Sequence, residues 1–248
     1  MKGVNPGTYV VSATPRVGDN QIGVTTIHVL DVDYPRADVV LGPGVTINAR
    51  LFDVPAGADL TKMQISLLPL ESYLPVPEPS GIQPNAAITI AGVQPGDYVL
   101  KVAGLPDTAY VKAARSDQRD VLEQFMQVQY DAQVPLDIQL AFDGVQIAGV
   151  VTDAAGQASD HASVVLIPDG NRRHRPDQYR MVTSAADGKF SIGGIPPGEY
   201  KLLAWEFIEA NAWLNPDFMI NYEEFGAAVT LGPNARVSAQ IRITPERR

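Results

Sequence analysis

One turn sequence occurs three times in this chain and constrains its fold more than any other feature. The pattern is Gly-(Val/Ile)-x-Pro-Gly-x-Tyr; it begins at Gly3, Gly92 and Gly194, so the copies start 89 and 102 residues apart. Average usage of glycine and proline predicts the three fixed Gly and Pro positions at only about 2 in 10,000 starting points. Proline sets φ near −65° at the second position of a turn, and glycine supplies a positive φ at the third. The spacing is that of one β-sandwich domain, so the chain is expected to repeat such a unit.

A strand is predicted directly after each turn, with the tyrosine as its first residue. The three segments are residues 9–11, 98–102 and 200–204. A tyrosine that enters a strand at the corner of a sandwich can donate a hydrogen bond back to the preceding turn, as in Ig-like domains. We therefore expect the three tyrosines to stabilise the fold rather than to bind a ligand.

Other strands recur in the same order and define the expected modules. Short apolar or alternating segments separated by Gly/Pro turns are typical of a sandwich or barrel. The chain is therefore predicted to be all-β, a tandem array of Ig-like or prealbumin-like β-sandwich modules. The predicted modules are 1–42, 43–142 and 143–248. The expected first strands are 45–51 and 145–151, second strands 65–69 and 164–168, strands before the turn 88–90 and 190–192, and last strands 38–41, 136–140 and 237–243.

The first of these modules contains only its back half. Residues 1–42 begin at the signature turn, so the front strands of a sandwich have no counterpart in them. The sequence is thus expected to be a fragment of a longer protein, or a half-module that packs on neighbouring modules. A half-module leaves open sheet edges, which other strands can join.

The last 105 residues resemble a known family. The segments VVTDAAG (150–156), ASVVL (162–166), SAADGKFSI (184–192) and GIPPGEY (194–200) resemble the bacterial carboxypeptidase regulatory-like domain. The Asp187-Gly188 turn is expected to close a β-hairpin. The resemblance is weaker over 43–143, where Gln83-Pro84-Asn85 stands in place of that turn. It implies a prealbumin-like sandwich grouped with carbohydrate-binding-like folds, an extracellular or cell-envelope location, a scaffold or binding role, and no catalytic residues.

The residue inventory argues against several classes of function. The chain has no cysteine and a net charge of −9, which disfavours thiolate chemistry and nucleic-acid binding. His28, His161 and His174 form no zinc-binding motif, and no phosphate-binding or nucleophile motif is present. The acidic turns at Asp31-Val32-Asp33, Asp153 and Asp187 lack the regular offsets of a calcium loop. We therefore expect no enzyme activity, no metal and no cofactor. No apolar run is long enough to span a bilayer, and no signal peptide stands at Met1.

Two segments are candidates for ligand binding. The four arginines of residues 172–180 make a locally positive loop, which is either solvated or a contact for an anion or an acidic glycan, with Arg172, Arg173 and Arg175 as the candidates. The segment from Trp205 to Phe225 holds both tryptophans. Its rings either stack on a sugar, for which Trp205, Trp213 and Tyr222 are the candidates, or fold back and cap an open end of the sandwich.

These observations predict a non-catalytic extracytoplasmic array that acts as a spacer, an adhesion element or a carbohydrate-binding element. The alternative is an assembly component in which the segment from Trp205 to Phe225 docks a partner protein. A hydrolase of transthyretin-like fold is the least favoured interpretation, because such an enzyme ends in Tyr-Arg-Gly-Ser and this sequence ends in Thr244-Pro245-Glu246-Arg247-Arg248.

Overall fold

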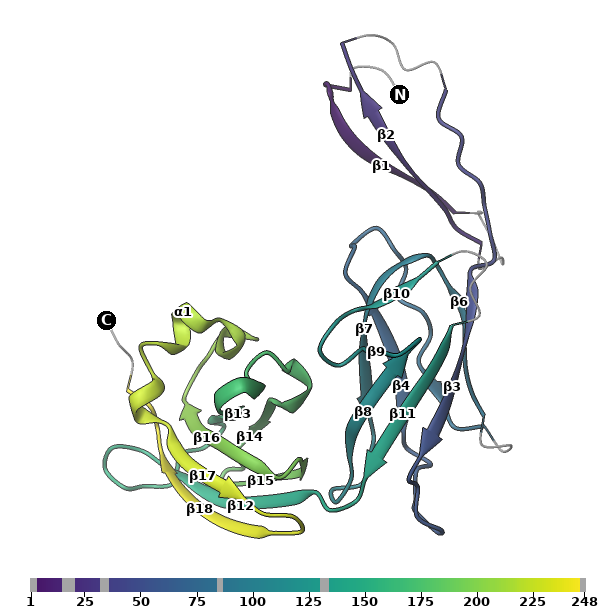
Figure 1. Cartoon of the computed structure of the whole chain (residues 1–248). Helices are drawn as coiled ribbons and strands as arrows, with labels where there is room; N and C mark the ends of the chain where they lie inside the picture. The colour runs from purple at the N-terminus through teal and green to yellow at the C-terminus, as the bar shows by residue number, and fades with distance from the viewer. Residues whose placement is uncertain (1–3, 15–20, 32–35, 84–86, 130–133, 246–248) are drawn as a thin grey trace. The chain divides into compact units, whose positions relative to one another are not determined.

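The computed structural model describes residues 4–14, 21–31, 36–83, 87–129 and 134–245. Strands dominate these ranges, and the helical elements are single turns (Figure 1). The prediction of an all-β chain is confirmed. Among the described residues, no helix has the length and apolar character required to cross a membrane.

The N-terminal part is a two-stranded antiparallel sheet. It pairs β1 (Gly7–Ala13) with β2 (Gly23–Val29), and Tyr9 lies opposite Ile27. Ile22, just before β2, forms an isolated antiparallel bridge with Gly42. The bridge lies on the edge of β2 that does not pair with β1.

The middle part forms two sheets. One has the order β10-β7-β4-β5 and the other β6-β3-β11-β8-β9. Alternate residues of these strands are buried, as in a sandwich with one solvated face per sheet. The strands are β3 (Val45–Phe52), β4 (Gln64–Pro69), β5 (Ser80–Gly81), β6 (Ile88–Val93), β7 (Gly96–Ala103), β8 (Tyr110–Ser116), β9 (Arg119–Asp120), β10 (Met126–Val128) and β11 (Pro135–Ala141).

The C-terminal part repeats this succession. Its sheets have the orders β15-β12-β18 and β14-β13-β16-β17, and the first strand β12 is parallel to the last strand β18. Three short helical turns lie between β16 and β17, in the place where the middle part has β8 and β9. The strands are β12 (Val145–Thr152), β13 (Ser163–Pro168), β14 (Arg180–Thr183), β15 (Lys189–Ile195), β16 (Gly198–Trp205), β17 (Ala227–Leu231) and β18 (Arg236–Arg242); the helical turns of this part are η1 (Gly170–Arg172), η2 (Pro176–Gln178), η3 (Ala212–Leu214), α1 (Pro216–Met219) and η4 (Glu223–Phe225).

Contacts divide the chain into two compact units. The first comprises Met1–Arg50, Met63–Ala103 and Ala114–Asp137, and the second comprises Leu51–Lys62, Gly104–Ala113 and Ile138–Arg248. The core of the second unit lies between its two sheets, where apolar side chains of every strand are buried. The module boundaries at residues 43 and 143 stay predictions.

The tyrosine of each signature turn makes the predicted hydrogen bond. The hydroxyls of Tyr9, Tyr98 and Tyr200 donate to the carbonyls of Asn5, Gln94 and Pro196, each at 2.8 Å. The three bonds share one geometry, because every donor lies four residues after its acceptor. Burial raises the pKa of Tyr98 to about 12, and nearby Glu71 adds to this shift. The interpretation of the repeat as a device that closes a turn is confirmed.

Two local predictions are wrong. Residues 38–41 form no strand, and Val40 is 80% exposed. In the C-terminal part the last strand, β18, pairs with the first strand, β12. The described residues before β1 contain no first strand that could pair with residues 38–41 in this way. The Asp187-Gly188 turn exists, with Gly188 at φ +74°, but it joins strands of different sheets instead of closing a hairpin. Pro84, Asn85, Val32 and Asp33 lie outside the described residues.

Removing the hydroxyl tests the role of the turn. We expect Tyr200→Phe to lower the free energy of unfolding by about 1–2 kcal/mol, because a buried carbonyl loses its donor. Both tryptophans lie in the C-terminal part, so urea unfolding followed by tryptophan fluorescence reports this part alone. Tyr98→Phe is the control, and it should leave that fluorescence transition in place. An unshifted transition for Tyr200→Phe would contradict the structural role.

Candidate functional site

The segment from Trp205 to Phe225 lies on the outer face of the β14-β13-β16-β17 sheet. β13 is buried on both faces: Val164 and Leu166 belong to the inner core, while Val165 and Ile167 belong to a second cluster. β16 alternates in the same way, with Leu203 and Trp205 in the second cluster. An antiparallel sheet commonly exposes one face to water, so this double burial requires a cover. The residues between β16 and β17 provide it.

The cover places both tryptophans in its interior. Trp205 is 3% exposed and Trp213 is 8% exposed, and Met219 of α1 packs with them. Tyr222 is half-buried against the same cluster. This burial favours packing over a stacking platform for sugars. The cover lies over a sheet face, so the expectation that it caps an open end of the sandwich is wrong.

The ring geometry is that of a packed core. The Trp205 ring meets Tyr222 edge-on, with centroids 5.8 Å apart and planes at 82°, and Phe218 lies 4.8 Å from Tyr222. Such edge-to-face pairs add to the free energy gained by burial. The indole nitrogen of Trp205 is buried without a hydrogen-bond partner. The ring therefore contributes through its apolar area and not through its polar group.

Arg172 closes over the signature turn of the C-terminal part. Its guanidinium donates to the carbonyls of Glu199 at 2.7 Å and Pro197 at 3.2 Å, and to the Tyr200 hydroxyl at 3.3 Å. The guanidinium carbon also lies 4.6 Å from the centre of the Tyr200 ring, within cation–π range. The sequence predicts that Arg172 contacts a ligand, whereas in the structure its guanidinium donates hydrogen bonds to the signature turn.

The second glycine of the signature is required by this close approach. A Cβ atom on Gly198 would lie 2.2 Å from the Arg172 guanidinium. In the middle part, a Cβ atom on Gly96 would lie 2.4 Å from Leu74. Arg172 and Leu74 both follow the strand that pairs with the tyrosine strand, β13 and β4. Both modules thus place a side chain against the glycine of the turn, and that side chain would have to move to admit a Cβ atom; Gly198 and Gly96 also have positive φ angles of 150° and 156°.

Arg173 ties the arginine-rich loop to the cover. Its guanidinium forms a bidentate pair with the Glu223 carboxylate, and Lys201 donates to the same carboxylate at 2.7 Å. The Arg173 guanidinium lowers the pKa of Glu223 most, Lys201 lowers it further, and burial opposes both. Arg175 forms a bidentate pair with Asp177, at 2.7 and 2.9 Å. The predicted positive patch is therefore balanced by acids of its own unit.

Sequence reasoning missed two of the participating side chains, and it gave Arg180 no individual role. Glu223 and Lys201 are distant in sequence from the arginines and from each other, although the acid-rich end of the cover was a possible signal. Arg180 donates to the carbonyls of Tyr179 and Gly194, at 2.9 and 3.2 Å, and burial lowers the pKa of its guanidinium. It thereby links β14 to Gly194, the first glycine of the signature turn.

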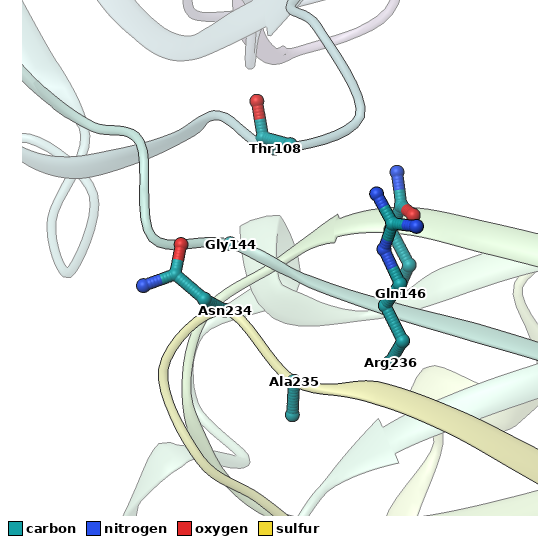
Figure 2. A pocket seen from close by; sticks show the side chains of 6 residues that line it. All are labelled: Thr108, Gly144, Gln146, Asn234, Ala235 and Arg236. Carbon is teal, nitrogen blue, oxygen red and sulfur yellow. The ribbon is translucent and has the colours of Figure 1, made fainter.

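A small cavity of about 170 Å³ lies elsewhere in the second unit (Figure 2). Its polar side chains come from Thr108, Gln146, Asn234 and Arg236, beside Gly144 and Ala235. Arg236 is the one titratable residue among these six, so the lining offers no pair of groups for acid–base or nucleophilic chemistry. No sequence pattern pointed to this cavity.

The histidines are scattered. The Nδ1 atom of His28 lies 3.0 Å from the Thr8 hydroxyl across the β1–β2 pair, and His161 sits in an exposed turn. In the described part of the chain, no three His, Asp or Glu side chains gather closely enough to hold a metal ion.

Substitution of Gly198 tests the close approach at the turn. We expect Gly198→Ala to destabilise the C-terminal part by about 2 kcal/mol or more, because the new methyl group displaces Arg172. Gly232→Ala, with no atom within 4 Å of its Cβ position, is the matched control. The double variant Arg172→Ala/Gly198→Ala should lose less than the sum of the single losses. Strict additivity in urea unfolding would contradict the contact.

The Glu223 ion pairs predict a dependence of stability on pH. The pKa of this carboxyl is lowered from its ordinary value of 4.5. Its contribution is therefore complete above that value and is lost as the pH falls through the lowered pKa. Glu223→Gln should cost about 1 kcal/mol at pH 7 and progressively less as the pH falls below the ordinary pKa of the carboxyl. Glu209→Gln is the control within the cover; a pH-independent loss for Glu223→Gln would refute the pairing.

Comparison with known proteins follows the same division of the chain. Residues 146–208 match the family described as carboxypeptidase regulatory-like domain. No curated protein sequence matches the chain. Among solved structures, the Bacillus anthracis TIE protein is 10% identical with a TM-score of 0.30; the match covers 95% of this chain and 41% of that protein. A streptococcal ancillary pilin is 13% identical (TM-score 0.33, covering 98% and 77%), and the Streptococcus agalactiae minor pilin GBS52 is 11% identical (TM-score 0.32, covering 82% and 98%). The predicted resemblance is thus confirmed for residues 146–208, which match the carboxypeptidase regulatory-like domain family.

Proposed function

We propose that this chain is a non-catalytic array of β-sandwich modules that serves as a spacer or adhesion element at the cell surface or in the envelope. The main support for this proposal is that the three signature tyrosines form hydrogen bonds within their own turns. Each hydroxyl closes its own turn at 2.8 Å, and Tyr98 and Tyr200 are 0% and 1% exposed. Hydroxyl groups that donate hydrogen bonds to their own turn stabilise the fold.

The candidate ligand residues support the same proposal. Arg172 binds backbone carbonyls of the turn, Arg173 binds Glu223, and Arg175 binds Asp177. Trp205 and Trp213 fill the space between the sheet and its cover. A scaffold needs these internal contacts, whereas a binding site needs the same groups to be available. The surface location rests on the resemblance of residues 146–208 to the regulatory-like domain.

The exposed side of the cover supports a second role, the docking of a partner protein. Phe207 is 77% exposed and Ile220 is 72% exposed, although both adjoin the buried cluster in sequence. The segment 205–225 carries five acidic residues and no basic residue. Apolar side chains within a negative field suit a protein surface that is apolar with a basic rim. An acidic glycan would be repelled.

A binding screen separates these functions. We expect no capture on a glycan array, and capture of basic amphipathic peptides from a displayed library. The double variant Phe207→Ser/Ile220→Ser should weaken that capture at least about tenfold, because it removes apolar area at the contact. Its melting temperature should stay unchanged, since both side chains are exposed.

Trp213→Ala is the structural control, and it should unfold the cover at a cost of about 3–5 kcal/mol. A panel of hydrolase substrates, tested with and without a chelator, should give no turnover. Turnover would overturn the scaffold proposal. Glycan capture that survives the double variant would overturn the docking role and restore the carbohydrate role.

A further inference from the structure

A polar cavity forms where the first and last strands of the C-terminal part begin. β12 and β18 are parallel, so their first residues lie side by side, and Gln146 lies opposite Arg236. Asn234 comes just before β18, and Thr108, from the segment Gly104–Ala113 of the same unit, completes the polar lining (Figure 2). The parallel topology therefore brings together polar side chains that are distant in sequence.

Backbone hydrogen bonds fix the walls of this cavity. The amide of Gly144 donates to the carbonyl of Thr108 at 2.9 Å, and the amide of Asn234 donates to the carbonyl of Asp143 at 2.8 Å. Gly144 is required here, because a Cβ atom on it would lie 2.7 Å from the Thr108 carbonyl oxygen. Asn234 has a φ of +59°, a left-handed conformation that asparagine adopts more readily than most residues. The side chains of the lining therefore project from an ordered backbone, which reduces the entropy cost of binding.

The polar side chains of the lining are available to a ligand. Within the part of the chain that the structure describes, no hydrogen bond or ion pair is made by the side chains of Thr108, Gln146, Asn234 and Arg236. A hydroxyl or a primary amide can donate or accept hydrogen bonds, whereas a guanidinium only donates. A ligand rich in acceptors would therefore satisfy all four side chains at once.

Arg236 differs in this respect from the arginines of the loop at residues 172–180. Carbonyls or carboxylates of the second unit accept hydrogen bonds from Arg172, Arg173, Arg175 and Arg180. Arg236 is exposed on β18, and no acid of the described ranges pairs with it. Its guanidinium is therefore not engaged in stabilising the fold.

The two acids next to the lining in sequence face other groups. Burial raises the pKa of Tyr110 to about 12, and the Asp143 carboxylate beside its hydroxyl adds to this shift. Asp107 packs on β15, since a Cβ atom on Gly193 would lie 2.7 Å from the Asp107 side chain. Neither carboxylate belongs to the lining. Arg236 is thus the charged group of the cavity, and its field favours an anion.

We propose that this cavity binds a small carboxylate, either a free acid or the C-terminus of a peptide. The Arg236 guanidinium pairs with both carboxylate oxygens, and their remaining lone pairs accept hydrogen bonds from the two side-chain amides and the Thr108 hydroxyl. The volume of about 170 Å³ suits a carboxylate with a few attached atoms. The cavity lies outside the cover and the signature turn, so this inference does not rest on the proposed scaffold and docking roles.

Nuclear magnetic resonance of the full isotope-labelled chain tests the proposal, because the side-chain amides of Gln146 and Asn234 give signals of their own. Acetate, titrated against chloride at constant ionic strength, should shift both signals along one saturable curve. Acetamide has a similar shape without the charge, and it should bind at least about tenfold more weakly. N-acetylglycine distinguishes the two sources: tighter binding than acetate assigns a peptide C-terminus, and equal or weaker binding assigns a free acid.

Two arginines on one strand provide the variant and its matched control. Arg236→Gln should weaken acetate binding at least about tenfold, because the bidentate pair is lost. Arg242→Gln should leave the affinity unchanged, since Arg242 is exposed on the same face of β18 but lies outside the lining. Asn234→Gly removes one amide and keeps the left-handed backbone, so the affinity should fall by about threefold to tenfold.

Several outcomes would overturn the proposal. Shifts that do not saturate, or equal affinities for acetate and acetamide, would show that no carboxylate is selected. Sulfate that competes as strongly as acetate would assign the cavity to oxyanions of any shape. Equal losses for Arg236→Gln and Arg242→Gln would place the anion elsewhere. The comparison of acetate, acetamide and sulfate uses the unaltered chain, so it decides the question even if a variant is destabilised.

Discussion

The hydrogen bond from a tyrosine hydroxyl to the carbonyl four residues earlier is the interaction on which the rest of the structure depends. It fixes the angle at which β1, β7 and β16 leave the signature turn, and so which residues of each strand face inward. The side chains of β16 that point inward form part of the core of the C-terminal part. Those that point outward, Leu203 and Trp205, are apolar and are buried by the cover. A buried donor and acceptor that satisfy each other also remove two costs of burying polar groups.

The cover explains why one module differs from another on the same frame. In the middle part, Leu68 and Val99 lie opposite each other on the outer sheet face and remain 39% and 43% exposed. In the C-terminal part, the equivalent face is buried under the residues between β16 and β17. The ion pairs of Glu223 with Arg173 and Lys201 hold that insertion to the loop and to the sheet. The charged groups near the rings therefore anchor the cover.

Sequence reasoning reached the strands and the turns because both depend on local pattern. Tyrosine after Pro-Gly, the alternating pattern along β6 and β15, and the repeated order located the strands that recur in both larger modules, but β5, β8, β9, β10, β14 and β17 were not predicted. The site was harder, because the roles of Arg172 and Trp205 depend on partners distant in sequence. The composition of residues 172–180, with four arginines, predicts a positive patch. Only the fold shows that Glu223 pairs with one of these arginines, Arg173. Residues 38–41 failed for a related reason: their pattern suits a strand, but the described chain offers no first strand to pair with them.

The parallel pairing of β12 with β18 has a mechanical consequence. The chain enters the C-terminal part at the start of β12 and leaves it at the end of β18, and in a parallel pair these points lie at opposite ends of the ladder. Tension along the polypeptide would therefore load the pair in shear, with the seven residue pairs from Gln146–Arg236 to Thr152–Arg242 resisting together. An antiparallel first and last strand would instead unzip one pair at a time. The topology thus places the first and last strands of the C-terminal sandwich in a shear geometry.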